Sequence, residues 1–129
     1  MAEPVRIALL GCGNVGAQVV RLLSEHADDL TPRVGRPLEL VGVAVRDASR
    51  PREGVRSDLL TEDAQALVSR GDVDLVVELM GGIEPARSLV LTAMKNGASV
   101  VTANKALMAA DGASLHDAAR DNDVDLYFE

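Results

Sequence analysis

Three glycines, Gly11, Gly13 and Gly16, are the first residues of this chain whose type and spacing could do chemistry. They directly follow an apolar run and open a segment with helical periodicity, which is the context that makes G-x-G-x-x-G informative. The first glycine permits a tight turn, the second lets the backbone approach a pyrophosphate, and the third lets helix and strand pack closely. Free N–H groups at the start of the helix would then face the phosphates. The pattern predicts a dinucleotide-binding loop.

The residues that follow the second apolar run are the next candidates for a binding role. This run ends in Val45, Arg46 and Asp47, which we expect to meet the adenosine ribose of the dinucleotide. An acidic residue at this place binds the 2′-hydroxyl of NAD, whereas an arginine accommodates the 2′-phosphate of NADP. Because Arg46 comes first and further arginines follow closely, the sequence favours NADP, and Asp47 leaves NAD open.

Two more segments fall where predicted strands end, which is the edge at which open α/β sheets bind ligands. One holds Gly81 and Gly82, whose small size would let the backbone pass close to the nicotinamide ribose. The other holds Lys105, whose ammonium group would lie beside the nicotinamide and a reacting oxygen. We therefore expect Gly81 and Lys105 to bind the cofactor, and Lys105 also to be catalytic. A solvated loop lysine is the open alternative.

The hydrophobic pattern predicts the elements that must hold these residues in place. Apolar, β-branched runs predict strands at 5–10, 38–45, 59–60, 74–80, 99–102 and 124–128. Apolar residues at helical spacing predict helices from 15 to about 30, and at 62–68, 85–96, 105–108 and 114–121. We expect Thr61 to cap the second helix and Gly97 to end the third.

Strands and helices thus alternate along the chain, and most strands are apolar throughout. Strands of this kind are buried on both faces, which is typical of a parallel sheet covered by helices. The predicted fold is α/β, a doubly wound, mostly parallel Rossmann-type sheet with helices on both faces. We expect residues 1–129 to form one NAD(P)-binding domain.

Composition narrows the functional classes. The 129 residues are 47% hydrophobic and 26% charged, with a net charge of −7, two aromatic residues and one cysteine. An acidic chain with few aromatic residues is a poor nucleic-acid binder, and no apolar run is long enough for a transmembrane helix. A single cysteine and an N-terminus unlike a signal peptide favour the cytoplasm. Because the sequence stops directly after an apolar run, we expect a fragment of a longer protein.

Four motifs together resemble the homoserine dehydrogenase family. They are GCGNVG after VRIALL, AVRD after the second predicted strand, VDLVVELMGG, and VVTANKALMA. The resemblance runs from Val5 to Glu129, and the pair ELMGG and TANKAL is far more specific than the glycine loop alone. It covers only the family's N-terminal cofactor domain, so the substrate-binding and dimerisation region would be absent from this chain.

The resemblance implies a reaction and several residue roles. Members of the family reduce L-aspartate 4-semialdehyde to L-homoserine with NADPH or NADH, a step toward threonine and methionine. By position, Asn14 and Val15 look like contacts of the pyrophosphate loop, and Arg46 like the 2′-phosphate contact. Lys105 resembles the family's lysine beside nicotinamide and substrate. Glu129 resembles the first ligand of a monovalent cation site, such as one for Na⁺. The parent enzyme would be a homo-oligomer.

Three other functions fit parts of the same pattern. A non-catalytic dinucleotide-sensing or regulatory domain would share the fold but would not need Lys105. A methyltransferase can also carry a glycine-rich loop after its first strand, and it would bind S-adenosylmethionine instead. A pure oligomerisation module would bind neither ligand.

Overall fold

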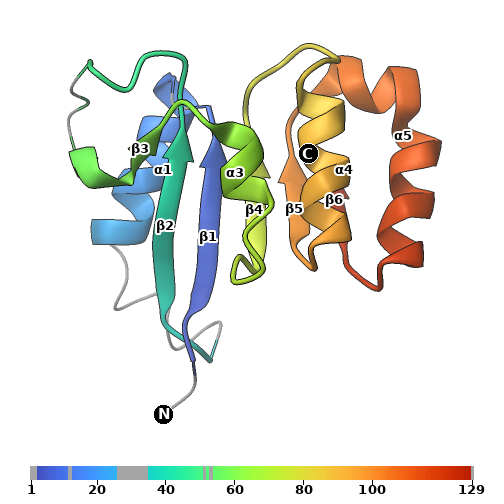
Figure 1. The fold of residues 1–129 in the computed structure, drawn as a ribbon, viewed down its shortest axis with the longest axis horizontal. Helices are drawn as coiled ribbons and strands as arrows, with labels where there is room; N and C mark the ends of the chain where they lie inside the picture. The colour runs from blue at the N-terminus through green and yellow to red at the C-terminus, as the bar shows by residue number, and fades with distance from the viewer. Residues whose placement is uncertain (1–2, 12, 26–34, 51, 53, 129) are drawn as a thin grey trace.

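Strands and helices alternate along the whole described chain (Figure 1). The computed structural model describes residues 3–11, 13–25, 35–50, 52 and 54–128. The strands are β1 (Val5–Leu10), β2 (Leu38–Ala44), β3 (Leu60–Thr61), β4 (Leu75–Glu78), β5 (Ser99–Thr102) and β6 (Leu126–Phe128). The helical segments are α1 (Asn14–Glu25), the 3-10 turn η1 (Ser57–Leu59), α3 (Ala64–Val68), α4 (Ala86–Lys95) and α5 (Lys105–Asp121).

The strands of the described residues form one parallel sheet. Its order is β3-β2-β1-β4-β5-β6, and every neighbouring pair runs parallel. The direction of the strand order reverses between β1 and β4, which is where doubly wound sheets bind dinucleotides. This topology confirms the predicted Rossmann-type fold.

Helices cover the two faces of the sheet unequally. Helices α3, α4 and α5 pack on one face, against Ala8, Val76 and Val100. Helix α1 packs on the opposite face, against Ile7, Leu9 and neighbouring β2 residues (Figure 1). Both faces carry helices, as predicted, and the larger of the two buried clusters lies under α3, α4 and α5.

Part of the α1 face bears an apolar row across three strands. Val77, Val101 and Tyr127 stand in register on β4, β5 and β6. Among the described helices, only α1 packs on this face, and it lies over β1 and β2. Tyr127 therefore stays 55% exposed, whereas Phe128, on the opposite face of β6, is 45% exposed on a strand that has a partner on one side only in the described residues.

The predicted cap of helix α3 was wrong by two residues. Asp63 is the N-cap, and its carboxylate accepts a hydrogen bond from the Ala66 N–H at 2.9 Å. Thr61 instead ends strand β3, and its hydroxyl oxygen accepts from the Asp63 N–H at 3.0 Å. Threonine and aspartate are both good N-caps, so the sequence alone did not distinguish Thr61 from Asp63. In the fold, Thr61 pairs with Ala44 of β2 as part of strand β3, which leaves Asp63 as the cap.

The two predicted helices 105–108 and 114–121 meet at a kink within α5. The backbone of Asp111 leaves helical geometry, with φ −147° and ψ 22°, and the helix continues on either side. The Arg87 guanidinium of α4 donates a hydrogen bond to the Asp111 carboxylate and forms an ion pair with it. Hydrogen bonds from Arg87 and Ser114 lower the pKa of Asp111. The kink is thus fastened to the neighbouring helix.

The remaining boundaries agree with the sequence to within a few residues. Strand β4 is shorter than predicted, but the Leu79 N–H still donates to the Leu10 carbonyl at 2.9 Å. Helix α4 ends one residue early, and Gly97 follows with a φ of +93°, the left-handed conformation typical of a helix stop. The predicted continuation of α1 beyond Glu25 falls outside the described residues.

We expect Leu107→Ala to destabilise the fold strongly. Leu107 is fully buried in the first turn of α5, so truncation leaves a cavity and costs about 2–5 kcal/mol. Leu22→Ala is the matched control, because Leu22 on α1 is 48% exposed and its truncation should change stability by about 0.5 kcal/mol or less. Urea unfolding followed by circular dichroism measures both. Equal losses in the two variants would contradict the assigned core.

Candidate functional site

Gly11 directly follows β1 and adopts a backbone conformation that only glycine adopts readily. Its φ is +93°, and its N–H donates to the Ala44 carbonyl of β2 at 2.8 Å. A Cβ at this position would lie 3.3 Å from the backbone carbon and oxygen of Leu79. Gly11 therefore allows the loop after β1 to pass tightly between the ends of β2 and β4.

Gly13 has a different reason to be glycine. It is exposed, and a Cβ there would meet nothing within 4 Å among the described residues. The chain's own packing thus leaves this side of the loop open, as a cradle for a phosphate requires. Helix α1 begins at the next residue, Asn14, followed by Val15 and the buried Gly16. Free N–H groups of this first turn give an anion a place to bind.

The carboxyl end of β2 and the loop that follows it lie beside the glycine turn. The Val45 N–H donates to the Thr61 carbonyl of β3 at 2.8 Å, which fixes where β2 stops. Arg46 and Asp47 follow and are both exposed. The Arg46 guanidinium has no hydrogen-bond or ion-pair partner among the described residues, so it is available to a ligand.

The loop after β4 is shaped by two left-handed glycines. Gly81 has a φ of +77° and Gly82 a φ of +73°, and both are exposed with open space where a Cβ would be. This backbone conformation accounts for both glycines without a ligand. It also turns the chain at the carboxyl end of β4, next to the point between β1 and β4 where the strand order reverses.

A fully buried carboxyl group stands directly before this loop. Glu78 accepts hydrogen bonds at one oxygen from the Met80 N–H at 2.7 Å and the Gly81 N–H at 3.3 Å. Its other oxygen accepts from the Thr102 hydroxyl of β5 at 2.7 Å. No basic side chain contacts it in the described part of the chain, so these three donors offset the cost of burying it.

Asn104 links the same loop to helix α5. Its amide nitrogen donates to the Gly82 carbonyl at 2.6 Å, and its amide oxygen accepts from the Leu107 N–H at 3.0 Å as the N-cap of α5. The Asn104 N–H donates to the Thr102 hydroxyl oxygen at 3.0 Å. Glu78, Thr102 and Asn104 therefore form one connected network, which we call the strand-end network.

Lys105 is the first residue of α5, held by this network. Its side chain is exposed and has no hydrogen-bond or ion-pair partner in the residues that the structure describes. A cation at a helix N-terminus is disfavoured by the helix dipole, typically by about 0.3–1 kcal/mol. Helix stability therefore does not account for a lysine here.

The structure brings most of the predicted site residues to one edge of the sheet. Gly11, Gly13, Gly16, Val45, Arg46, Asp47, Gly81 and Lys105 all lie at or just beyond the carboxyl ends of β1, β2, β4 and β5. Asn14 and Val15 begin α1 at the same edge. Glu129, the predicted cation ligand, lies outside the described residues.

Sequence reasoning missed the strand-end network. Glu78 and Thr102 looked like ordinary ends of apolar strands, and Asn104 like part of a loop. An available signal was Asn104 itself, because asparagine directly before a helical segment is a strong N-cap. A glutamate at the end of an otherwise apolar strand was the second signal, since buried charged groups need partners.

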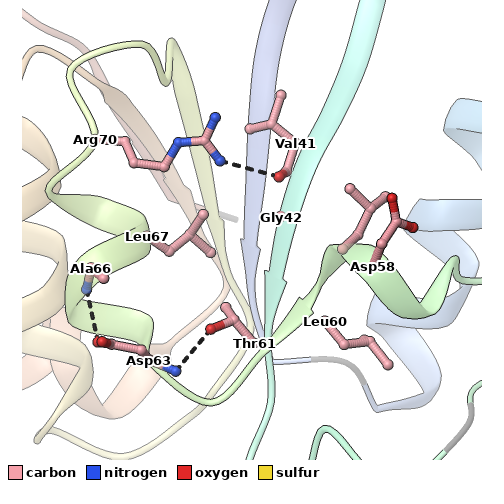
Figure 2. Close-up of a pocket in the computed structure, with 10 residues that line it drawn as sticks. Val41, Gly42, Asp58, Leu60, Thr61, Asp63, Ala66, Leu67 and Arg70 are labelled. Carbon is pink, nitrogen blue, oxygen red and sulfur yellow. Dashed lines mark hydrogen bonds between the residues drawn. The ribbon is translucent and has the colours of Figure 1, made fainter.

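A cavity of about 280 Å³ opens elsewhere, between β2, β3 and α3 (Figure 2). None of the predicted binding residues lines it. Its polar groups already have protein partners, for Asp63 caps α3 and Arg70 donates to the Val41 carbonyl at 3.3 Å and pairs with Asp72. The cavity therefore offers a ligand little unsatisfied chemistry.

Two other kinds of feature are absent from the described residues. No helix there is long and apolar enough to cross a membrane. No cluster of three or more histidine, cysteine, aspartate or glutamate side chains there is placed to hold a metal ion.

The edge of the sheet fits a dinucleotide. The open cradle beside Gly13 and the start of α1 suit a pyrophosphate, and the free Arg46 suits an anionic group beyond it. Gly81 and Lys105 follow β4 and β5, on the other side of the strand-order reversal from the glycine loop. These features support a bound cofactor that spans the point where the strand order reverses.

Comparison with known proteins gives a consistent result. Residues 11–129 match the family model described as homoserine dehydrogenase, NAD binding domain. The homoserine dehydrogenase of Corynebacterium glutamicum is 62% identical over 97% of this chain and 28% of its own length. That of Mycobacterium tuberculosis is 53% identical over 98% of this chain and 29% of its own length.

A solved structure agrees with these relatives. The S. aureus homoserine dehydrogenase crystal structure at pH 7.5 superposes with a TM-score of 0.92 at 38% identity, over 100% of this chain and 32% of that one. The chain thus spans less than a third of the length of the two curated relatives and about a third of this solved chain.

Thr102→Val should destabilise the protein by about 2–4 kcal/mol. The change keeps the shape of the side chain but leaves a Glu78 oxygen and the Asn104 N–H without a partner in a buried place. Thr92→Val is the matched control, because the Thr92 hydroxyl only donates to a carbonyl within α4, and its loss should cost about 1 kcal/mol or less. The two stability changes follow from the urea concentrations at the midpoint of unfolding, provided that the slope of the unfolding free energy against urea concentration is unchanged. A Thr102 effect no larger than that of the control would rule out the network.

Proposed function

This chain belongs to the homoserine dehydrogenase family, as its NAD-binding domain, and on that premise we propose that it binds NAD(P) for the hydride transfer of such an enzyme. The parent enzyme would convert L-aspartate 4-semialdehyde to L-homoserine, within threonine and methionine biosynthesis. Small-molecule substrates of this kind, rather than a nucleic acid or a membrane, are the proposed partners.

One observation carries the proposal. The glycine loop after β1 and the Lys105 end of α5 lie at the same sheet edge, on either side of the point where the strand order reverses. A dinucleotide bound across this point has its pyrophosphate at Gly13 and its nicotinamide toward Gly81 and Lys105. This one placement of the cofactor uses all of these residues at once.

In the proposed reaction, bound NADPH supplies a hydride to the aldehyde carbon. Negative charge then develops on the substrate oxygen, which must finally receive a proton. Lys105 has a free ammonium group at this edge and would stabilise that charge electrostatically. The strand-end network holds the first turn of α5 and the Gly81 loop together, so that the lysine is presented at a fixed place.

We further propose NADP as the preferred cofactor, with NAD as the weaker alternative. The free Arg46 guanidinium would donate to a 2′-phosphate, and such charge-assisted bonds are strong. Asp47, the residue that would bind the 2′-hydroxyl of NAD, is engaged within its own loop.

Other features of the parent enzyme are proposals from the family. Most of the length of the curated relatives has no counterpart in these 129 residues, and that length would carry the remaining catalytic groups. Glu129 would begin a monovalent cation site, and the parent would be a homo-oligomer in the cytoplasm. The matched residues would act as the cofactor domain, 1–129.

Arg46→Ala should remove most of the preference for NADPH over NADH. Loss of charge-assisted hydrogen bonds to the 2′-phosphate costs about 1.5–3 kcal/mol, so the dissociation constant of NADPH should rise about tenfold or more. The affinity for NADH should change little. Isothermal titration calorimetry of the 129-residue chain measures both. Arg120→Ala, which removes an exposed arginine paired with Asp117 at the far end of α5, is the control. Equal NADPH affinities in the two variants would refute the role of Arg46.

The 129-residue chain alone should bind dinucleotide without turnover. We expect no homoserine-dependent reduction of NADP⁺ by the purified chain, because Lys105 supplies only part of the catalytic machinery. The measurement is the rise in NADPH absorbance over time, at a protein concentration high enough to detect slow turnover. Reduction at a rate typical of enzymes, about 1–10³ s⁻¹, would mean that these residues hold the whole active site.

A further inference from the structure

The loop that follows β2 carries two neighbouring residues with opposite consequences for the cofactor. Arg46 favours a 2′-phosphate, whereas Asp47 favours a free 2′-hydroxyl and repels a phosphate. An exposed aspartate beside a phosphate site would therefore weaken binding unless its carboxylate were held away. The contacts of residues 45–50, which we call the β2 loop, hold it in this way.

The Asp47 carboxylate is bound to Ser49. One carboxylate oxygen accepts from the Ser49 N–H at 3.0 Å and from the Ser49 hydroxyl at 2.5 Å. These two bonds, the hydroxyl bond first, lower the pKa of Asp47, and the nearby charges of Arg50 and Arg52 act in the same direction. A carboxylate held in this way keeps its charge, and the two bonds to its Oδ1 atom oppose its turning toward a ribose.

The backbone of the same loop is fastened from two sides. The Arg52 guanidinium donates to the Asp47 carbonyl at 3.0 Å and to the Arg50 carbonyl at 2.9 Å. The Ala48 N–H donates to the Glu62 carboxylate at 2.9 Å. The loop therefore has a defined course without a ligand, and Ser49 adds the bond that fixes the direction of the acidic side chain.

Arg46 differs from Asp47 in this respect. Its side chain is exposed and has no hydrogen-bond or ion-pair partner among the described residues, although Asp47 is its neighbour in sequence. The Asp47 carboxylate thus accepts hydrogen bonds from the serine rather than from the arginine. Among the described residues, nothing competes with an anion from outside the chain for the arginine.

We propose that Ser49 determines the cofactor preference of this site by holding the Asp47 carboxylate within the β2 loop, so that Arg46 alone meets the 2′ position of the cofactor. Ser49 is thus a positioning residue and does not touch the dinucleotide. The inference rests on the proposed function, because it presupposes that the loop receives the adenosine ribose.

Removal of the serine hydroxyl should release Asp47. The backbone bond to the carboxylate remains in Ser49→Ala, but the shorter of the two bonds is lost. The freed carboxylate can then accept from the ribose hydroxyls of NADH and oppose the phosphate of NADPH. The ratio of the dissociation constants, NADH over NADPH, should fall about three- to tenfold, with NADH binding tighter than before.

The experiment titrates NADPH and NADH separately into the 129-residue chain by calorimetry. The variants are Ser49→Ala, Asp47→Ala, the double variant, and Arg46→Ala. Ser57→Ala is the matched control, because Ser57 is exposed and its hydroxyl has no partner in the described residues. Circular dichroism melting of each variant establishes that it is folded.

Support requires two results together. Ser49→Ala must tighten NADH and lower the ratio, and the same substitution in the Asp47→Ala background must leave the ratio within about twofold. A serine that acted only on loop stability would weaken both cofactors alike. Ser57→Ala should match the unsubstituted chain.

Three results would overturn the inference. If Ser49→Ala leaves the ratio unchanged while Arg46→Ala still lowers it, the proposed function stands and the role of Ser49 fails. If Ser49→Ala weakens only NADPH, by the same factor with and without Asp47, the hydroxyl contacts the phosphate directly. If the unsubstituted chain binds neither cofactor, the proposed function fails and the role of Ser49 fails with it.

Discussion

The binding edge of this protein depends on one buried carboxyl group. Glu78 stands at the end of β4 without exposure to solvent, and its two oxygens reach the loop after β4 and the side chain of Thr102 on β5. Through Thr102 the network continues to Asn104, which holds Gly82 and starts α5. A buried acceptor of this kind is costly unless its oxygens have donors, so the surrounding backbone is confined to a narrow set of positions.

The β1 side of the strand-order reversal is organised by close backbone packing rather than by polar side chains. Gly11 lets the loop after β1 lie against the backbone of Leu79, while its N–H is bound to Ala44 of β2. The described backbone at the ends of β1, β2 and β4 is therefore joined by contacts through Gly11, Ala44 and Leu79. Arg46 and Lys105 lie one on each side of the strand-order reversal, and neither charged group has a hydrogen-bond or ion-pair partner among the described residues. The hydrogen bonds that join these strand ends use backbone groups, and those that link the loop after β4 to α5 use an uncharged side chain, so neither set involves these two cations.

Much of the fold was predictable from sequence because its signals are local and repeated. Continuous apolar runs indicated parallel strands, and Gly81, Gly82 and Gly97 marked turns that the structure places at positive φ. The less accurate predictions share a cause, since each depended on a contact between distant residues. Pairing of Thr61 with β2 moved the cap of α3 to Asp63, and α4 supplied the arginine that binds Asp111 where two predicted helices join.

The site divides in the same way. The placement of its glycines and charged residues at one sheet edge was predictable because a glycine triplet between strand and helix, with cations at later strand ends, is typical of dinucleotide sites. The strand-end network was not, because Glu78 and Thr102 lie 24 residues apart and only the register of β4 and β5 brings them together. The bond between Asp47 and Ser49 is local, yet a short polar sequence offers several such pairings and only the folded loop selects one.

Strand β6 has a consequence for the behaviour of the molecule in concentrated solution. In the described residues it is the outermost strand on its side, and Tyr127 and Phe128 are both partly exposed along it. Backbone groups on an open strand edge are a template for another chain, and aromatic side chains strengthen such pairing. The opposite edge, β3, has only two residues and ends at Thr61. Within the described residues, an added strand would therefore find three residues of edge backbone at β6, beside Tyr127 and Phe128, and only two at β3.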